Sequence, residues 1–206
     1  MNVLLINGSP NSDGCTYTAL AEVEKALKKS GVGTEWFHIG TKPIHGCIAC
    51  GKCREGGGCV FGDDPCNELG AKIKGADGIV VGSPVYFSGP NGTLCALLDR
   101  VFFSNMGAFK HKPAACVVSC RRGGASAAFD RLNKYFTIAQ MPVVSSQYWN
   151  AVHGNTPEHV LLDAEGLQIM RVLGSNMAWL LKCIESGNPP PEPEAERAFT
   201  CFHDGK

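Results

Sequence analysis

The sequence has no excess of either charge. Its 206 residues include 19 lysines and arginines and 19 aspartates and glutamates, which gives a formal net charge of zero. The basic residues form no stripe or run, whereas proteins that bind nucleic acid carry clustered positive charge. We therefore expect no nucleic acid among the partners of this chain.

Long apolar runs are also missing. No stretch approaches the roughly 18 consecutive apolar residues that cross a membrane, and the opening residues, MNVLLINGSP, lack the basic region that begins a secretory signal. We expect no membrane partner and a cytoplasmic location, where thiols stay reduced. Eleven cysteines, an odd number in a chain of this length, argue further against a secreted disulfide framework.

Short β-branched runs alternate with helical patterns along the chain. The runs that predict strands cover residues 2–6, 34–39, 77–83, 114–119 and 142–146. This alternation predicts an α/β fold, in which one parallel sheet has helices on both faces. Apolar residues make up 44% of the chain, as in a globular domain. We expect one domain over residues 1–187, including a cysteine-rich loop at 44–66, and a C-terminal tail over 188–206.

Three predicted loops follow strands at the carboxyl edge of this sheet, where open α/β sheets bind ligands. The first, NGSPNSDGCT (7–16), places small polar side chains and backbone amides at a helix start, which suits an anion. It contains neither the Gly-Lys of a nucleoside-triphosphate loop nor the Gly-x-Gly-x-x-Gly of a dinucleotide fold. Ser9, Asn11, Thr16 and Thr18 are candidate phosphate ligands, and an ordinary capped turn is the alternative.

The second and third loops add aromatic surface and positive charge. GSPVYFSGPNGT (82–93) carries Tyr86 and Phe87 at a strand end, and SCRRGGAS (119–126) sets two arginines before two glycines. Taken singly, the aromatic residues could pack under the next helix and the arginines could be solvated. Together the three loops predict a site for a flat, phosphorylated cofactor.

Four cysteines lie close together in GCIACGKCREGGGC (46–59), within a predicted loop longer than most connections. Their spacing, Cys47-x2-Cys50-x2-Cys53-x5-Cys59, suits four thiolate ligands of an iron–sulfur cluster. Unmetallated thiols and disulfides are the alternatives, and zinc, which prefers two more widely separated cysteine pairs, is third. Outside this run we expect Cys66 in a helix and Cys95, Cys116 and Cys183 in the core.

The segments LLINGSPNSDGCTYTAL, GIVVGSPVYFSGPNGTLCALLDR and CRRGG, in this order, resemble the flavodoxin-like NAD(P)H-dependent FMN reductases over about residues 1–146. The cysteine run after the second strand resembles the iron–sulfur flavoprotein branch of that family. The resemblance implies a flavodoxin-like sheet of five parallel strands, order 2-1-3-4-5, with FMN at the switch point. Two positions depart from the family pattern: Asn11 stands where arginine is common, and Cys15 where asparagine is common.

The resemblance also assigns residues to the cofactor. It implies Ser9, Asn11, Cys15, Thr16, Tyr17 and Thr18 around the phosphate, Pro84, Val85, Tyr86 and Phe87 beside the isoalloxazine, and Ser119, Arg121, Arg122, Gly123 and Gly124 at its pyrimidine edge. It implies Cys47, Cys50, Cys53 and Cys59 as ligands of a [4Fe-4S] cluster. We nominate no general acid or base, because the cofactors carry the chemistry.

Three functions remain open at this point. In the first, an FMN enzyme exchanges electrons with a small-molecule or redox-protein partner, through the cluster. In the second, a cluster-free enzyme uses NAD(P)H to reduce flavin, quinones or azo compounds. The third is a non-enzymatic flavin electron carrier, which the zero net charge disfavours. By the same resemblance we expect a homodimer or homotetramer.

Overall fold

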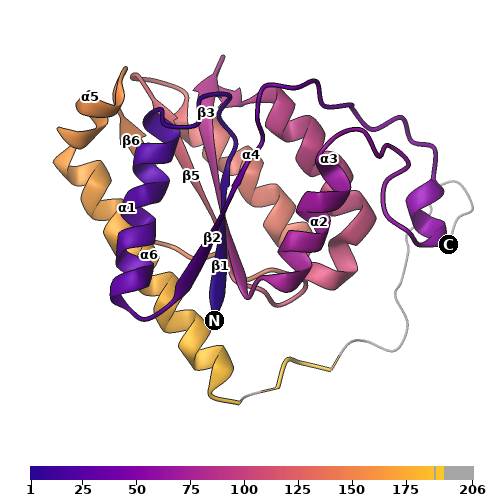
Figure 1. The fold of residues 1–206 in the computed structure, drawn as a ribbon. Helices are drawn as coiled ribbons and strands as arrows, with labels where there is room; N and C mark the ends of the chain where they lie inside the picture. Colours follow the sequence, from indigo (N-terminus) through magenta and orange to yellow (C-terminus); the bar gives the residue numbers. More distant parts are fainter. Residues whose placement is uncertain (188, 193–206) are drawn as a thin grey trace, which may run out of the picture.

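A computed structural model describes residues 1–187 and 189–192. The parallel strands are β1 (Asn2–Asn7), β2 (Gly33–His38), β3 (Gly78–Tyr86), β5 (Ala114–Cys120) and β6 (Ala151–His153), in the order β2-β1-β3-β5-β6 (Figure 1). Counted along the chain, this is the predicted order 2-1-3-4-5. The tail expected at 188–206 lies outside the described residues, apart from residues 189–192.

Helices cover both faces of the sheet (Figure 1). One face carries α1 (Cys15–Lys29), α5 (Pro157–Leu161) and α6 (Ala164–Glu185), and the other carries α2 (Cys66–Gly75), α3 (Gly92–Phe109) and α4 (Ala125–Ile138). Alternate residues of β1 enter the two cores: Leu4 and Ile6 face α2–α4, whereas Val3 and Leu5 face α1 and α6. Since both faces of the central strands are buried, β1, β3 and β5 are largely apolar, whereas the edge strand β2 is mixed. Within the described part of the chain, no helix is both long and apolar enough to cross a bilayer.

The fifth parallel strand is not where the sequence predicted it. Residues 142–146 form only an isolated bridge, between Val143 and Ala114, and the edge strand forms later, at β6. Ser146 Oγ donates to the Tyr148 carbonyl at 2.6 Å, and Asn150 Nδ2 donates to the Cys116 carbonyl at 3.0 Å. The chain therefore leaves the sheet edge and returns to it, because these two side-chain hydrogen bonds, one local and one to β5, replace those of a continuous ladder.

Several smaller features also differ from the prediction. A two-residue strand, β4 (Gly89–Pro90), folds back on the end of β3, and a 3-10 turn, η1 (Lys52–Glu55), lies in the cysteine loop. Cys116 is buried as expected, but Cys95 is half-buried and Cys183 is exposed. Cys66 is the first residue of α2, in agreement with the helix predicted there.

The parallel strands point their carboxyl ends at one edge of the sheet, at the top of Figure 1. The loops after β1, β3 and β5 therefore lie together there. The long loop after β2 begins at the same edge but then runs across α3 to η1, far from the sheet (Figure 1).

Candidate functional site

The loop after β1 leads into a helix start that has no anionic partner of its own. Gly14 is the N-cap of α1 and makes no side-chain cap, and the first turn contains no acidic residue. The first amides of a helix have no partner within the helix and carry its positive dipole end. Two buried hydroxyl-bearing residues belong to this segment: Thr16, in the first turn of α1, and Ser9, in the loop before it, which are 1% and 4% exposed. The loop is therefore suited to an anion held by amides and hydroxyls.

Close backbone contacts fix the position of this loop. The Gly8 amide donates to the Gly82 carbonyl at 2.8 Å, and Asn91 Nδ2 donates to the Gly8 carbonyl at 2.8 Å. A Cβ at Gly8 would lie 2.6 Å from the Gly82 oxygen, so no larger residue fits without backbone movement. Thr16 Oγ1 and Ser119 Oγ share a hydrogen bond of 2.8 Å, which joins the loop to β5. The first loop is thus attached to β3 and β5.

The second loop is a tight hairpin turn between β3 and β4. Phe87 and Ser88 occupy its tip with φ values of 50° and 60°, the left-handed pair of a type I′ turn, where glycine and asparagine are usual. The Phe87 side chain is fully exposed, at 107%, and Tyr86 is 45% exposed. A Cβ on Gly124 would lie 2.8 Å from Ser88 Cα, so the second and third loops are in contact. Two exposed aromatic rings therefore stand beside the third loop.

The other predicted cofactor residues fall into two groups. Pro84 and Val85 are half-buried at the end of β3, and Arg121, Arg122 and Gly123 are exposed just before Gly124, the N-cap of α4. Asn11 is exposed in the first loop. Other side chains are engaged elsewhere: Cys15 Sγ donates to the Gly154 carbonyl at 3.8 Å, Tyr17 packs on Trp36 with centroids 4.8 Å apart, and Thr18 Oγ1 donates to the Gly14 carbonyl. For Cys15 and Tyr17, only the backbone amides remain suited to an anion.

A cavity of about 360 Å³ adjoins the third loop and was not predicted. It extends from Arg122 and Gly124 along the interrupted edge strand, where Tyr148, Trp149 and His153 line it. Tyr148 and Trp149 are 59% and 55% exposed. The adjacent aromatic residues in QYWN were the available sequence signal, and they directly follow the run that predicted a strand at 142–146.

The four cysteines line one small pocket between their loop and α3. Its volume is about 30 Å³, and apolar residues complete the lining, among them Ile48, Val60 and Phe103. Cys47 and Cys50 are exposed, Cys53 and Cys59 are half-buried, and all four thiols are free. Within residues 1–187 and 189–192, no group of three or more His, Cys, Asp or Glu side chains is arranged around a single metal ion.

This pocket lies along α3, away from the three loops. Arg100, which contacts it, follows the N-cap Asn91 by nine residues, or about 14 Å at the helical rise. Asn91 contacts Gly8 in the first loop. The cysteine loop therefore begins beside the crevice of the three loops, while its sulfur atoms lie farther along the helix.

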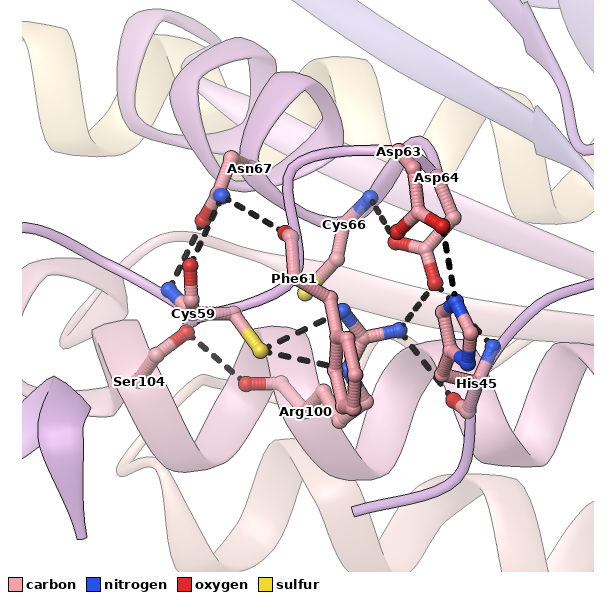
Figure 2. A network of polar contacts seen from close by, with 9 residues as sticks. All are labelled: His45, Cys59, Phe61, Asp63, Asp64, Cys66, Asn67, Arg100 and Ser104. Carbon is pink, nitrogen blue, oxygen red and sulfur yellow. Dashed lines mark hydrogen bonds and ion pairs between the residues drawn. The ribbon is translucent and has the colours of Figure 1, made fainter. Parts of the chain in front are cut away.

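Arg100 lies at the centre of a polar network (Figure 2). It lines the pocket together with Cys59 and Phe61. Its Nε and Nη2 each donate to Cys59 Sγ at 3.2 Å, and Nη1 donates to the His45 carbonyl and forms an ion pair with Asp64. Both side chains of the ion pair are 1% exposed. The Phe61 ring covers the guanidinium, with its centroid 5.0 Å from Cζ.

The network changes the acidity of two cysteines. Burial raises the pKa of the Cys59 thiol, but hydrogen bonds from the Phe61 backbone and from Arg100 outweigh it, so that pKa lies below its ordinary value. Burial raises the pKa of the neighbouring Cys66 thiol to about 12. Cys59 is therefore the thiol better suited to carry negative charge, and Cys66 the one that stays protonated.

Further hydrogen bonds hold the backbone around Cys59. Its amide donates to Asn67 Oδ1 at 2.8 Å, and Asn67 Nδ2 donates back to its carbonyl at 3.0 Å. Asp64 accepts from the amides of His45 and Cys66 at 3.0 and 3.2 Å. Sequence reasoning gave Arg100, Asp64 and Asn67 no role. The available signal was an arginine at a position of α3 otherwise occupied by core residues.

Comparisons with known proteins agree with this geometry. The family described as NADPH-dependent FMN reductase matches residues 1–156. The chain is 34% identical over 193 residues to an iron-sulfur flavoprotein of Methanocaldococcus jannaschii, covering 90% of this chain and all of that protein. It is 30% identical over 190 residues to an iron-sulfur flavoprotein of Methanosarcina thermophila, covering 90% and 97%. Its fold is similar to a flavodoxin from the domain Archaea, with a TM-score of 0.60 at 15% identity, covering 88% and 99%.

Proposed function

Because the chain belongs to the NADPH-dependent FMN reductase family and is an FMN-dependent oxidoreductase, we propose that it passes electrons between FMN and a [4Fe-4S] cluster held by Cys47, Cys50, Cys53 and Cys59. The single observation that carries the cluster is that these four cysteines line one pocket. The relatives named above are iron-sulfur flavoproteins, which favours the same assignment.

The first loop fits the phosphate of FMN. Its donors are uncharged: amides of the first turn of α1 and the hydroxyls of Ser9 and Thr16. A dianionic phosphate needs such donors at a helix start, and no carboxylate in that turn would repel it. We assign the isoalloxazine to the surface formed by the hairpin tip at Tyr86 and Phe87 and the third loop at Gly124, whose aromatic and backbone groups would hold a flat ring.

The cysteine pocket fits a cluster by the chemistry of its donor set. Four thiols and an apolar lining match the ligands and surroundings of a four-iron centre. Since the pocket volume is only about 30 Å³, we infer that the exposed Cys47 and Cys50 move outward when a cluster binds. When bound, a cluster transfers one electron at a time, whereas FMN can also accept a hydride, for which we propose NAD(P)H as donor.

We propose that the working form is a homodimer or homotetramer. Ile48, Val60 and Phe103 around the cysteine pocket are 63%, 52% and 55% exposed, and a second copy would cover this apolar surface. Within one chain the pocket is separated from the crevice by part of α3, so a neighbouring subunit could place its FMN nearer to the cysteines. The electron acceptor would be a small molecule or a redox protein in the cytoplasm.

Anaerobic purification of the full chain tests the cluster. We expect bound FMN together with about four irons and four sulfides per chain. Cys50→Ser should lose iron and sulfide and keep FMN, because Cys50 lies away from the three loops. Cys183→Ser is the matched control, since Cys183 is exposed and lies at the end of α6.

The same measurement separates the alternatives. A flavin spectrum without iron in the wild-type protein would contradict the cluster and favour a cluster-free reductase of flavin, quinones or azo compounds. Bleaching of the bound flavin by NADPH tests the donor separately. Equal iron in Cys50→Ser and Cys183→Ser would remove Cys50 from the ligand set.

A further inference from the structure

Arg100 contacts the cysteine loop through every polar atom of its side chain (Figure 2). Two of its hydrogen bonds go to Cys59 Sγ, at 3.2 Å from Nε and 3.2 Å from Nη2. The other two go to the His45 carbonyl, at 3.1 Å, and to the Asp64 carboxylate. Because the residue is 2% exposed, water cannot replace these partners. The guanidinium is therefore fixed relative to one sulfur atom.

The two donors on Cys59 suit a sulfur that carries negative charge. A planar guanidinium donates two nearly parallel hydrogen bonds, and such bonds are strongest to an anionic acceptor. A thiolate bound to iron keeps part of its negative charge and accepts in the same way. In the described part of the chain, no charged side chain donates to the sulfur of Cys47, Cys50 or Cys53. One of the four proposed ligands is thus set apart from the rest.

We propose that Arg100 is a positioning residue for the cluster, which holds the Cys59 sulfur in place and raises the reduction potential of the cluster through its two hydrogen bonds. The inference rests on the proposed cluster binding by Cys47, Cys50, Cys53 and Cys59. Reduction adds one electron, and hence one negative charge, to the cluster and its thiolates. Donors aimed at a ligand sulfur stabilise the reduced form more than the oxidised form.

The ion pair with Asp64 allows two effects on the reduction potential to be separated: that of the hydrogen bonds from Arg100 to Cys59, and that of the positive charge of Arg100. Its carboxylate pairs with Arg100 and neutralises it, so the directional donors are the main contribution that remains. Arg100→Lys keeps a positive charge beside Asp64 but cannot direct two donors at one sulfur. Asp64→Asn keeps the two donors and leaves the charge of Arg100 uncompensated. The two substitutions should therefore shift the reduction potential in opposite directions.

The experiment is a potentiometric titration of the full, cluster-loaded protein with dithionite as the one-electron donor. The signal of the reduced cluster is followed by electron paramagnetic resonance. For Arg100→Lys we expect the equilibrium constant for reduction to fall about tenfold, which lowers the potential by about 59 mV. For Asp64→Asn we expect a higher potential. Arg54→Gln is the control, because Arg54 lies over the Phe103 ring beside the pocket without donating to a cysteine sulfur. Its potential should match the wild type.

Equal potentials in Arg100→Lys and the wild type would overturn the inference, as would equal shifts in Arg100→Lys and Arg54→Gln. If Arg100→Lys retains no iron, Asp64→Asn decides: a higher potential supports the inference, and an unchanged or lower one overturns it. If the wild-type protein contains FMN but no iron, the proposed cluster fails, and the inference about Arg100 falls with it for that separate reason.

Discussion

The crevice of the three loops and the cysteine pocket differ in what fixes their geometry. The crevice is held by uncharged groups on adjacent strands: the Gly8 amide on the Gly82 carbonyl, and the Thr16 hydroxyl on Ser119. The pocket is fixed on one side by a buried ion pair, Arg100 with Asp64. The crevice is therefore held by uncharged backbone and hydroxyl groups, whereas the pocket depends on two charged side chains.

The two sides of the pocket also differ: the side with Cys59 is held by specific contacts, whereas the side with Cys47 and Cys50 is exposed. Around Cys59, the backbone is held by Asn67 and the sulfur by Arg100. On the opposite side Cys47 and Cys50 are exposed, and Ala49 between them has a positive φ of 54°, which is costly for a residue other than glycine. We infer that the side with Cys59 is already arranged to bind a ligand, whereas the side with Cys47 and Cys50 takes its final arrangement when the ligand binds.

The largest expected effect tests the fixed side of the pocket. Asp64→Ala removes one partner of a buried ion pair and leaves Arg100 charged and unpaired, so the free energy of unfolding should fall by about 3–5 kcal/mol. Glu55→Ala removes the partner of Lys52 in the same loop, where both side chains are exposed, and should cost at most about 1 kcal/mol. Urea unfolding of the metal-free proteins measures both. Equal costs would mean that the ion pair does not fix the pocket.

A smaller effect tests the backbone contacts of the crevice. Gly8→Ala places a Cβ 2.6 Å from the Gly82 oxygen, so we expect a loss of about 1–3 kcal/mol in unfolding free energy and weaker FMN binding. Gly46→Ala, at the start of the cysteine run, has no atom within 4 Å of its added Cβ. That control should stay within about 0.5 kcal/mol of the wild type. Fluorescence titration with FMN supplies the second readout, and wild-type affinity in Gly8→Ala would contradict the assignment of the first loop.

The smallest effect concerns α1, the helix that follows the first loop. Glu24 of α1 accepts from Thr34 and Trp36 of β2, at 2.7 and 2.8 Å. Burial raises the pKa of Glu24, but hydrogen bonds from Lys28, Thr34 and Trp36 outweigh it, so this pKa lies below its ordinary value of 4.5. The carboxylate therefore contributes stability above about pH 4.5, and this contribution is lost as the pH falls through the lowered pKa.

Glu24→Gln should accordingly cost about 1 kcal/mol at neutral pH, because it removes the charge that Lys28 pairs with. The difference from the wild type should stay constant down to about pH 5 and shrink in more acidic solution. Glu185→Gln, at the exposed end of α6, is the matched control. Urea unfolding across this pH range measures the effect, and a difference that grows in acid would contradict the sign derived above.

Local patterns were sufficient to predict most of the fold. The apolar runs at 2–6 and 77–83 are buried on both faces, so their composition alone marks them as central strands. The run at 142–146 has the same composition but lies at the sheet edge, where hydrogen bonds from Ser146 and Asn150 interrupt the ladder. The turn at Phe87 and Ser88 was equally hidden, because neither residue type signals a positive φ.

The sequence by itself determined the alternation of strands and helices, the three loops after the strands and the presence of four closely spaced cysteines, since each depends on residues near one another in the chain. The sheet order 2-1-3-4-5 was expected only from the family resemblance, because it depends on pairing between distant segments. Only the tertiary structure decided that those cysteines lie along α3 and that Arg100 reaches Cys59. Arg100 and Asp64 are 36 positions apart, and nothing in either segment alone indicates the other. Their contact follows from the packing of the loop on α3, because a buried charge is stable only where packing supplies its partner.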